Sequence, residues 1–441
     1  MPASSRSKEE MGMQLKKVII APDSFKGALT AQQATDIIAA EVSAAFPDCE
    51  IVKMPIADGG EGSVDTIIGA VGGVVFEAQV LSPDDRIISA KYGIAAIGTA
   101  SDGTASAGTA SPGTAPDGTA SDGTASAGTA SAGTASDGTT PDGTASDGTA
   151  IIEMAQSSGI TKQKKLHPMT SNTFGFGELI LNALDRGARD FILCIGGSAT
   201  TDGGCGMAAG LGVKFLDEQG IGFVPCGQTL VDIAVIDMGS IDKRIAQSSF
   251  TVMCDVDNPL FGPRGAAHIF GPQKGANPGQ VFLLDKGLRH LGQALNMQFG
   301  KDFANIPGAG AAGGLGAGCM AFLDATLMSG IDAILKLCGF EKHLLDADLI
   351  ITGEGRLDSQ SFYGKVLSGI LSKAGAVPVW SICGVCECDD DVLSKNNVVV
   401  FETSKGITIQ ESMSNAEKYL GVAAHAAMQH YCSRIAIAAH K

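Results

Sequence analysis

The strongest constraint on the fold is a recurring order of segments. A short apolar run of strand length is followed by a glycine-rich polar loop and then by a helix-like run. Residues 191–212 (FILCIGGSATTDGGCGMAAGLG) are the clearest instance. A turn from strand to helix presents backbone N–H groups and the positive end of a helix, and both can bind a phosphate. The same turn can also serve only to pack a strand against a helix, and this stretch alone leaves both interpretations open.

The same order occurs twice at the start of the chain. An apolar run at 17–21 leads into PDSFKG and a helical segment capped by Thr30. A second run at 50–55 leads into ADGGEG and a helical segment at 63–71. Alternating strands and helices predict a parallel sheet with helices on its faces. Ligands bind outside the carboxyl ends of the strands in such sheets, so we expect both polar loops at a binding site.

The pattern changes after residue 73. Residues 74–93 form short alternating runs around a turn at 82–85, which is typical of antiparallel strands. The chain has 441 residues, enough for two or three domains with full cores. Further strands are expected at 151–155, 251–255, 348–352, 378–384 and 398–401.

Residues 98–150 form a pentapeptide repeat, G-T-A-x-x. The repeat contains no aromatic residue, no lysine or arginine, and, apart from proline, no apolar side chain larger than alanine. Such a segment cannot bury enough apolar surface to offset the entropy of ordering it, so we predict that it is disordered. Removing the repeat would leave two strands joined by a tight turn, which suggests an expansion at the tip of a hairpin. A tethering or adhesive role is the alternative.

Charge and composition disfavour several classes of partner. A formal net charge of −16 makes nucleic acid or an anionic membrane a poor main partner. No apolar run reaches the roughly 18 residues needed to cross a bilayer. Residues 1–14 form a polar tail without the apolar core of a secretory signal. The eleven cysteines lack a regular framework spacing and predict free thiols in a reducing cytoplasm, with CGVCEC at 383–388 as the one group that could bind a metal or act in redox chemistry.

Five loops that follow strands carry compact sets of aspartate or glutamate, lysine, hydroxyl side chains and glycine. They are PDSFKG, ADGGEG, GGSATTDGG, CDVDNP and TGEGRLD. Phosphoryl transfer requires this chemistry, because the protein must neutralise phosphate charge, hold Mg²⁺ and place a carboxylate near the attacking hydroxyl. The chain has no P-loop motif, no protein-kinase motif and no Ser-His-Asp pattern. A G-x-G-x-x-G at Gly308, Gly310 and Gly313 follows a loop rather than a strand and is a poor match to a dinucleotide site.

Six segments resemble those of the bacterial glycerate kinases of the type I, two-domain family. They are IIAPDSFKGALTA, PIADGGEGSVDT, IGGSATTDGGCGM, CDVDNPLFGPRGAAHIFGPQKGA, PGAGAAGGLGAG and ITGEGRLDSQSFYGK. The resemblance begins near Leu15, extends to the C-terminal helix and keeps the family's order. The departures are the repeat, the N-terminal tail and CGVCEC, where the family tends to have a small apolar or glycine run.

The resemblance implies ATP-dependent phosphorylation of D-glycerate, most often to 2-phosphoglycerate, with Mg²⁺. It also implies an α/β fold with two domains around a cleft. A flavodoxin- or Rossmann-like parallel-sheet domain would comprise residues 15–73 and 305–441, and a second α/β domain, residues 74–304, would be inserted in it. The chain would act as a cytoplasmic monomer or homodimer. The alternatives are 3-phosphoglycerate as product, an NAD-dependent hydroxyacid dehydrogenase, and a non-catalytic ligand-binding protein of the same fold.

Three residues are predicted to be catalytic. Asp202 is the first candidate for the base near the substrate hydroxyl, with the capping of a turn as the alternative. Asp58 would contact substrate or Mg²⁺, and Lys26 would contact a phosphate or carboxylate, or else lie solvated at the surface. Asp255 and Asp257 are predicted metal ligands, unless they cap a turn. The predicted substrate- and nucleotide-binding residues come from the same loops: Asp23, Ser24, Gly59, Gly60, Glu61, Gly196, Gly197, Ser198, Thr200, Gly203, Gly204, Lys274, Gly313, Gly314, Glu354, Arg356 and Asp358.

Overall fold

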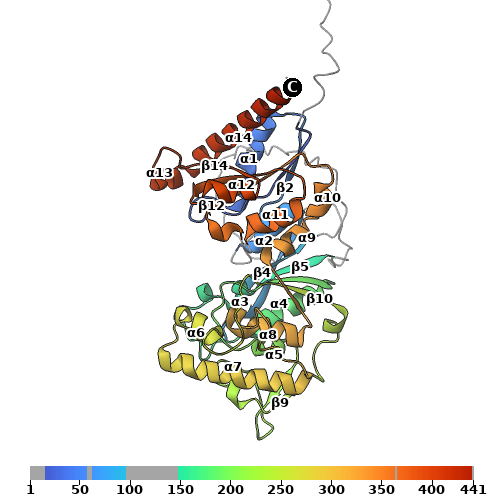
Figure 1. The fold of residues 1–441 in the computed structure, drawn as a ribbon. Helices are drawn as coiled ribbons and strands as arrows, with labels where there is room; N and C mark the ends of the chain where they lie inside the picture. Colours follow the sequence, from blue (N-terminus) through green and yellow to red (C-terminus); the bar gives the residue numbers. More distant parts are fainter. Residues whose placement is uncertain (1–14, 57–61, 96–147, 363–364, 440–441) are drawn as a thin grey trace, which may run out of the picture.

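The structure, a computed structural model, describes residues 15–56, 62–95, 148–362 and 365–439. The predicted polar tail, most of the ADGGEG loop (Asp58, Gly59, Gly60 and Glu61) and residues 98–147 of the repeat lie outside the described residues. Two large sheets with helices on their faces organise the described part (Figure 1).

The first sheet has five strands, all parallel, in the order β14-β13-β12-β1-β2. Two come from the start of the chain and three from its end, as the predicted domain built from both chain ends requires. The strands are β1 (Lys17–Ile20), β2 (Glu50–Lys53), β12 (Leu349–Leu357), β13 (Val379–Cys386) and β14 (Val398–Glu402).

Alternate residues of the central strands enter two different cores. Val18 and Ile20 pack with α1 (Ala31–Ala45) and α14 (Ala416–Ala439) on one face. Ile19 packs on the other face with α2 (Ser63–Val71), α9 (Gly330–Leu337) and α11 (Val366–Ala374). Burial on both faces explains the continuous apolar runs in these strands. Three shorter helices lie near this sheet: α10 (Phe340–Leu344), α12 (Asp390–Lys395) and α13 (Ile409–Ser414).

The second sheet has six strands in the order β11-β10-β6-β5-β4-β3. It is antiparallel between β3, β4 and β5 and parallel from β5 to β11. The change to antiparallel pairing follows residue 73, as the sequence predicts. The strands are β3 (Gly73–Leu81), β4 (Ile87–Ala95), β5 (Thr149–Glu153), β6 (Asp190–Cys194), β10 (Ser249–Met253) and β11 (Thr326–Met328).

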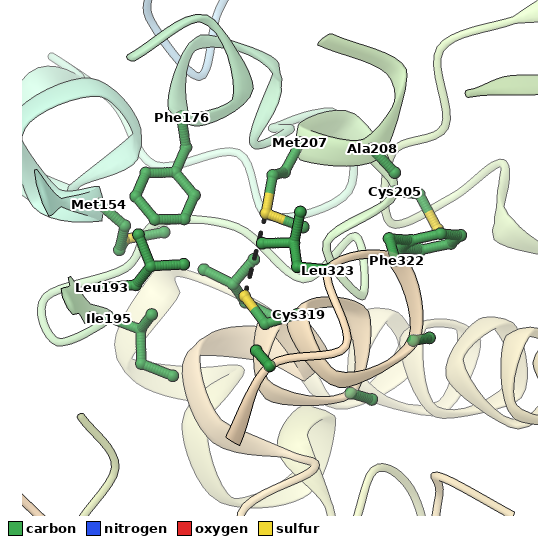
Figure 2. Close-up of a cluster of buried hydrophobic side chains, with 14 of the residues drawn as sticks. Met154, Phe176, Leu193, Ile195, Cys205, Met207, Ala208, Cys319, Phe322 and Leu323 are labelled. Atoms are coloured by element: carbon green, nitrogen blue, oxygen red, sulfur yellow. Dashed lines mark hydrogen bonds between the residues drawn. The ribbon is translucent and has the colours of Figure 1, made fainter. Parts of the chain in front are cut away.

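A large apolar core covers one face of this sheet. Figure 2 shows part of it, where Leu193 of β6 lies with Phe176, Met207, Cys319 and other apolar side chains. The Cys319 Sγ is 3.9 Å from the Met207 Sδ. A small sheet in the order β8-β7-β9 lies on this side, formed by β7 (Lys214–Leu216), β8 (Gly222–Phe223) and β9 (Val235–Asp237). The helices on this side are α3 (Met154–Ser158), α4 (Phe174–Asp185), α5 (Cys205–Gly210), α6 (Ala266–Phe270), α7 (Pro278–Phe299) and α8 (Ala311–Phe322).

The opposite face of the six-stranded sheet meets the first sheet through a shared layer of helices. Ile151, Ile192 and Met253 belong to the same apolar core as α2 and α9. Figure 1 shows α2, α9 and α11 between the two sheets. The carboxyl ends of strands from both sheets can therefore contribute to one region.

The predicted boundary at 304/305 differs from the sheet topology. β11 pairs with β10 in the six-stranded sheet, with Thr326 opposite Thr251. Leu315 and Phe322 of α8 are buried in the core of that sheet. Residues 305–328 therefore pack with the six-stranded sheet, because their apolar side chains are buried there, and the change between the two parts falls near Ser329.

The repeat begins and ends at paired strands. β4 and β5 are antiparallel neighbours, with Ala95 opposite Thr149 and Ile94 opposite Ala150. The predicted hairpin flanks are therefore confirmed.

Deletion of residues 98–147 would join Ile97 to Gly148. For D-glycerate, the substrate that the resemblance implies, the kcat/KM of the shortened chain is expected to stay within about twofold of the full chain. The melting temperature should not fall, because logarithmic scaling gives the longer loop a closure cost of about 2–3 kcal/mol. Steady-state kinetics and thermal unfolding of both proteins check this. A large loss of activity in the shortened chain would show that the repeat has a role.

Candidate active site

The first cavity lies at the carboxyl ends of β1, β12, β13 and β14 and has a volume of about 850 Å³. PDSFKG and TGEGRLD contribute to it from the five-stranded sheet, at the edge expected for ligand binding by a parallel sheet. The CDVDNP loop contributes Asp255 from the carboxyl end of β10 in the six-stranded sheet. The predicted residues that line it are Asp23, Ser24, Lys26, Asp255, Glu354, Arg356 and Asp358.

The PDSFKG loop is held in place by its own backbone. Phe25 and Leu29 exchange two backbone hydrogen bonds of 2.9 Å each, and Phe25 is buried in the core beside β1. Gly27 has a φ of +79°, a conformation that glycine adopts without strain. The tight loop ends at Thr30, whose hydroxyl and Gln33 form a capping box for α1. This anchoring fixes where Asp23 and Lys26 enter the cavity.

Carboxylates and cations occur together in this cavity. The pKa of Glu354 is raised to about 7, mainly by burial and also by the charges of Asp23 and Asp358. Ser361, which donates a 3.0 Å hydrogen bond to Glu354 Oε2, and the charge of Lys365 oppose this rise. The Nζ of Lys365, the residue directly before α11, lies 3.9 Å from the Oδ1 of Asp358. A site with both signs of charge suits a polyphosphate that brings a cation with it.

The second cavity is smaller, about 250 Å³, and lies at the carboxyl ends of β6 and β10. Its lining includes Gly196, Gly197, Ser198 and Lys274 from the predicted set. Gly197 has a φ of +75°, so the turn after β6 needs glycine there.

Lys274 is a buried cation in the wall of the second cavity. Its side chain is 1% exposed, and its Nζ donates to Ser198 Oγ at 2.7 Å and to the Thr200 carbonyl at 2.6 Å. Burial lowers the pKa of Lys274 to about 7, and the charge of Asp202 acts in the opposite direction. No carboxylate of the described residues forms an ion pair with Lys274. An anion in this cavity would therefore gain a charged partner that is already fixed in position.

Asp255 lines both cavities. It follows the carboxyl end of β10, and its Oδ1 accepts a 2.9 Å hydrogen bond from the backbone N–H of Gly330, the first residue of α9. The two cavities therefore meet at one carboxylate.

Asp202 lies in neither cavity, in contrast to its predicted role as the base. Its side chain is fully buried, and Thr173 donates to Oδ2 from both its backbone N–H (2.8 Å) and its hydroxyl (2.7 Å). The N–H groups of Gly206 and Gly204 also donate, at 3.1 and 3.4 Å. Burial raises the pKa of Asp202, and these donors oppose the rise. We therefore propose that Asp202 holds the start of α4 against the glycine turn, which is the structural alternative.

Gly203, directly after Asp202, and Gly313 in α8 serve close packing between the two segments. A Cβ on Gly313 would lie 2.0 Å from the Thr200 carbonyl oxygen, and one on Gly203 would lie 2.1 Å from Leu291. Gly203 also donates a 3.1 Å hydrogen bond to the Gly313 carbonyl. Thr200, Gly203, Gly204, Gly313 and Gly314 line neither cavity.

The predicted metal pair is divided. Asp257 lines neither cavity, and its exposed carboxylate forms a 3.0 Å ion pair with Arg264. Within the described ranges, no group of three or more His, Cys, Asp or Glu side chains is arranged to hold a metal ion. No helix in the same ranges is long and apolar enough to cross a membrane.

Several residues of the region were not predicted. Glu153, at the end of β5, is buried and accepts hydrogen bonds from Gly62 (3.2 Å) and Val64 (2.6 Å), so it ties the start of α2 to the six-stranded sheet. Lys365, Thr403 and Ser404 line the first cavity. The run Thr-Ser-Lys-Gly directly after β14 is the signal that could have identified the last two.

Comparisons with known proteins agree with one another. The model of the glycerate kinase family matches residues 18–111 and 102–432. A glycerate kinase of Halalkalibacterium halodurans is 38% identical over 374 residues, which cover 84% of this chain and 86% of that protein. The glycerate 2-kinase of Escherichia coli K12 is 37% identical over 408 residues, 91% of this chain and 94% of that protein. A crystal structure of a Salmonella typhimurium LT2 protein assigned as glycerate kinase 2 is similar with a TM-score of 0.74 and 32% identity, over 95% of this chain and 99% of that one.

Proposed function

This chain belongs to the glycerate kinase family, and from that premise we propose that it transfers the γ-phosphate of ATP to a hydroxyl group of D-glycerate, with 2-phosphoglycerate and ADP as products. One observation carries the proposal. A cavity lined by carboxylates and cations and a smaller cavity lined by a buried lysine meet at Asp255. Two substrates bound in these cavities would face each other across one carboxylate.

The first cavity is the proposed nucleotide site. Lys26, Arg356 and Lys365 supply positive charge there, and a triphosphate carries the opposite charge. Asp23, Glu354 and Asp358 supply carboxylate oxygens, which are the hard ligands that Mg²⁺ prefers. In kinases Mg²⁺ is commonly held by one or two carboxylates together with the substrate phosphates. One or two of these three carboxylates would fit the ion in that way, although the three are not grouped as a metal site of protein ligands alone. Bound Mg²⁺ would neutralise phosphate charge.

The second cavity is the proposed site for D-glycerate. A volume of about 250 Å³ accommodates a three-carbon hydroxy acid. Lys274 and Ser198 would bind the carboxylate, with backbone of the Gly196–Gly197 turn beside it. Because Asp255 lines the same cavity, a hydroxyl group of a substrate bound in this way would face it.

The proposed step uses Asp255 as the base. The substrate hydroxyl oxygen forms a bond to the γ-phosphorus as the bond from that phosphorus to the β,γ-bridging oxygen breaks. The hydroxyl proton passes to the Asp255 carboxylate, and ADP leaves with the bridging oxygen. Gly330, through its hydrogen bond to Oδ1, would orient this carboxylate.

A coupled assay with ATP, Mg²⁺ and D-glycerate tests the proposal. ADP should form only when D-glycerate is present, and no reduced nicotinamide should form from NAD. If no ADP is released, the kinase proposal fails and a non-catalytic protein of the same fold is favoured. The glycines of the possible dinucleotide motif give no support to a dehydrogenase, because a Cβ on Gly310 would lie 2.2 Å from the Pro259 carbonyl oxygen and the segment is packed against protein.

The affinity for D-glycerate is expected to depend on pH through Lys274. The pKa of Lys274 is about 7 in the free protein, so its charged form dominates below that pH and is lost above it. The substrate carboxylate stays ionised throughout this range. With saturating MgATP, kcat/KM for D-glycerate should therefore fall as the pH rises through about 7, whereas kcat should change less because a bound carboxylate raises the lysine pKa.

Lys274→Arg provides the matched comparison for this pH profile. A guanidinium stays charged over the whole range, so the variant should lose the decline even if its overall affinity is lower. A wild-type profile that is flat between about pH 6.5 and 9, or a decline that persists in the arginine variant, would contradict the assignment to Lys274.

A further inference from the structure

The first cavity is chemically divided. Its charged side chains come from the loop after β1, from the carboxyl end of β12 with Asp358 directly after it, from the start of α11, and from Asp255 after β10. A separate group of apolar side chains comes from α13 and the first turns of α14. We name this group the α13 wall, and it consists of Ile409, Met413, Ala416 and Leu420. A phosphate chain and its cation are charged and would gain nothing from contact with apolar side chains.

The α13 wall is accessible and yet well anchored. Ile409 and Met413 are 51% and 43% exposed, whereas Leu420 is buried in the core that α14 forms with α1 and the five-stranded sheet. Thr408 caps α13 by accepting a hydrogen bond from the Glu411 N–H at 3.2 Å. Ser412 Oγ lies 3.0 Å from Thr403 Oγ1, which fastens α13 to the end of β14. A rigid apolar surface that faces a cavity offers contact without much cost in side-chain ordering.

The α13 wall lies at the end of the first cavity that is farthest from the second cavity, the proposed site for D-glycerate. α14 packs with α1 on the outer face of the five-stranded sheet, whereas α9 and α11 lie on the inner face, between the sheets (Figure 1). Asp255 and Ile331 line the cavity on that inner side. Met413 approaches Gly27, since a Cβ there would lie 3.5 Å from the Met413 methyl carbon, so the wall borders the PDSFKG loop. The cavity therefore runs from an apolar end, past the charged loops, to Asp255.

We propose that the α13 wall binds the purine base of the nucleotide. Thr403 and Ser404 line the same cavity, and their hydroxyl oxygens, which already donate to Gly384 and Glu402, would accept a hydrogen bond from the polar edge of the base. The inference rests on the proposed kinase function, because it assumes that the phosphates occupy the charged part of the same cavity. A purine has apolar faces and a polar edge, and ligand sites combine apolar walls with a few polar groups in this way. With the base against α13, the phosphates extend past Lys26 toward Asp255 and the acceptor.

Nucleotide binding without turnover tests the inference in the full chain. Calorimetric titration with ADP and Mg²⁺, and separately with pyrophosphate and Mg²⁺, distinguishes contacts to the base from contacts to the phosphates. Met413→Glu should weaken ADP binding by about tenfold or more, because it places a charge against an apolar base, and should leave pyrophosphate binding within about twofold. Ile409→Glu is the second variant and should act in the same direction. Both positions are exposed on the helix, so these changes should leave the fold intact.

Val422→Glu is the matched control. Val422 is an apolar residue of α14 with 59% exposure that lines neither cavity, and its replacement should change neither affinity. Wild-type ADP affinity in both wall variants would overturn the inference and leave the kinase proposal standing. An equal loss of ADP and pyrophosphate binding would also overturn it, since the wall would then act on the phosphates. A wild-type protein that binds neither ligand would overturn the kinase proposal and the inference together.

Discussion

Asp255→Asn is expected to lower kcat at least about 100-fold while changing the KM values for ATP and D-glycerate by no more than a few-fold. General acid–base catalysis commonly contributes a factor of about 10² to 10⁴, and an amide cannot accept the hydroxyl proton. The substitution keeps the size of the side chain and can keep the hydrogen bond from the Gly330 N–H. Steady-state kinetics with each substrate varied in turn, together with a thermal unfolding curve, provides the measurement.

Asp257→Asn is the control for this experiment. It lies two residues further along the same loop, but its carboxylate is exposed, pairs with Arg264 and lines neither cavity. Exposed ion pairs contribute little to stability, so this variant should keep near-normal kcat and melting temperature. If Asp255→Asn retained near-normal kcat, Asp255 would not be the base. If Asp257→Asn lost as much activity as Asp255→Asn, the loop as a whole would matter rather than the carboxylate where the cavities meet.

Lys274→Met is expected to raise the KM for D-glycerate by about 10- to 100-fold. A hydrogen bond to a charged group contributes about 1.5–3 kcal/mol, and the variant removes the only buried cation among the described residues that line the second cavity. Methionine has a similar shape and carries no charge. The affinity for ADP, which binds in the other cavity under this proposal, should stay within about twofold.

Loss of Lys274 also removes the hydrogen bonds that it donates to Ser198 Oγ and the Thr200 carbonyl, so folding must be measured separately. Circular dichroism, the melting temperature and ADP binding serve that purpose, and Ser198→Ala provides a milder change in the same cavity. A folded Lys274→Met protein with an unchanged KM for D-glycerate would show that the acceptor carboxylate binds elsewhere.

Much of the fold could be predicted from the sequence. The strands at both chain ends are short apolar runs bounded by polar loops, and this pattern identified a parallel sheet whose β1 and β12 turn out to be neighbours. The boundary near Ser329 could not be predicted, since the glycine-rich segment before β11 shows little apolar periodicity. Its assignment depends on which core buries Leu315 and Phe322.

The candidate site was only partly predictable. PDSFKG and TGEGRLD were expected at one edge of the sheet, and they line one cavity because the carboxyl ends of neighbouring parallel strands meet. Asp202 shows the limit of such reasoning. The loop around Asp202 has the composition of a catalytic turn, but Thr173, 29 residues earlier in the chain, occupies the carboxylate with two donors. Only the tertiary structure shows that the Asp202 carboxylate is buried away from both cavities, whereas Asp255 lines both.

The most direct test of the proposed reaction is ³¹P NMR of the product formed from ATP, Mg²⁺ and D-glycerate. Phosphorylation at the 2-hydroxyl places the phosphorus beside a carbon with one proton, so the proton-coupled signal should be a doublet, and ADP should appear in equal amount. A triplet would show transfer to the 3-hydroxyl, next to a carbon with two protons, and would contradict 2-phosphoglycerate as product. The absence of any phosphate ester, with ATP unconsumed, would contradict the kinase function itself.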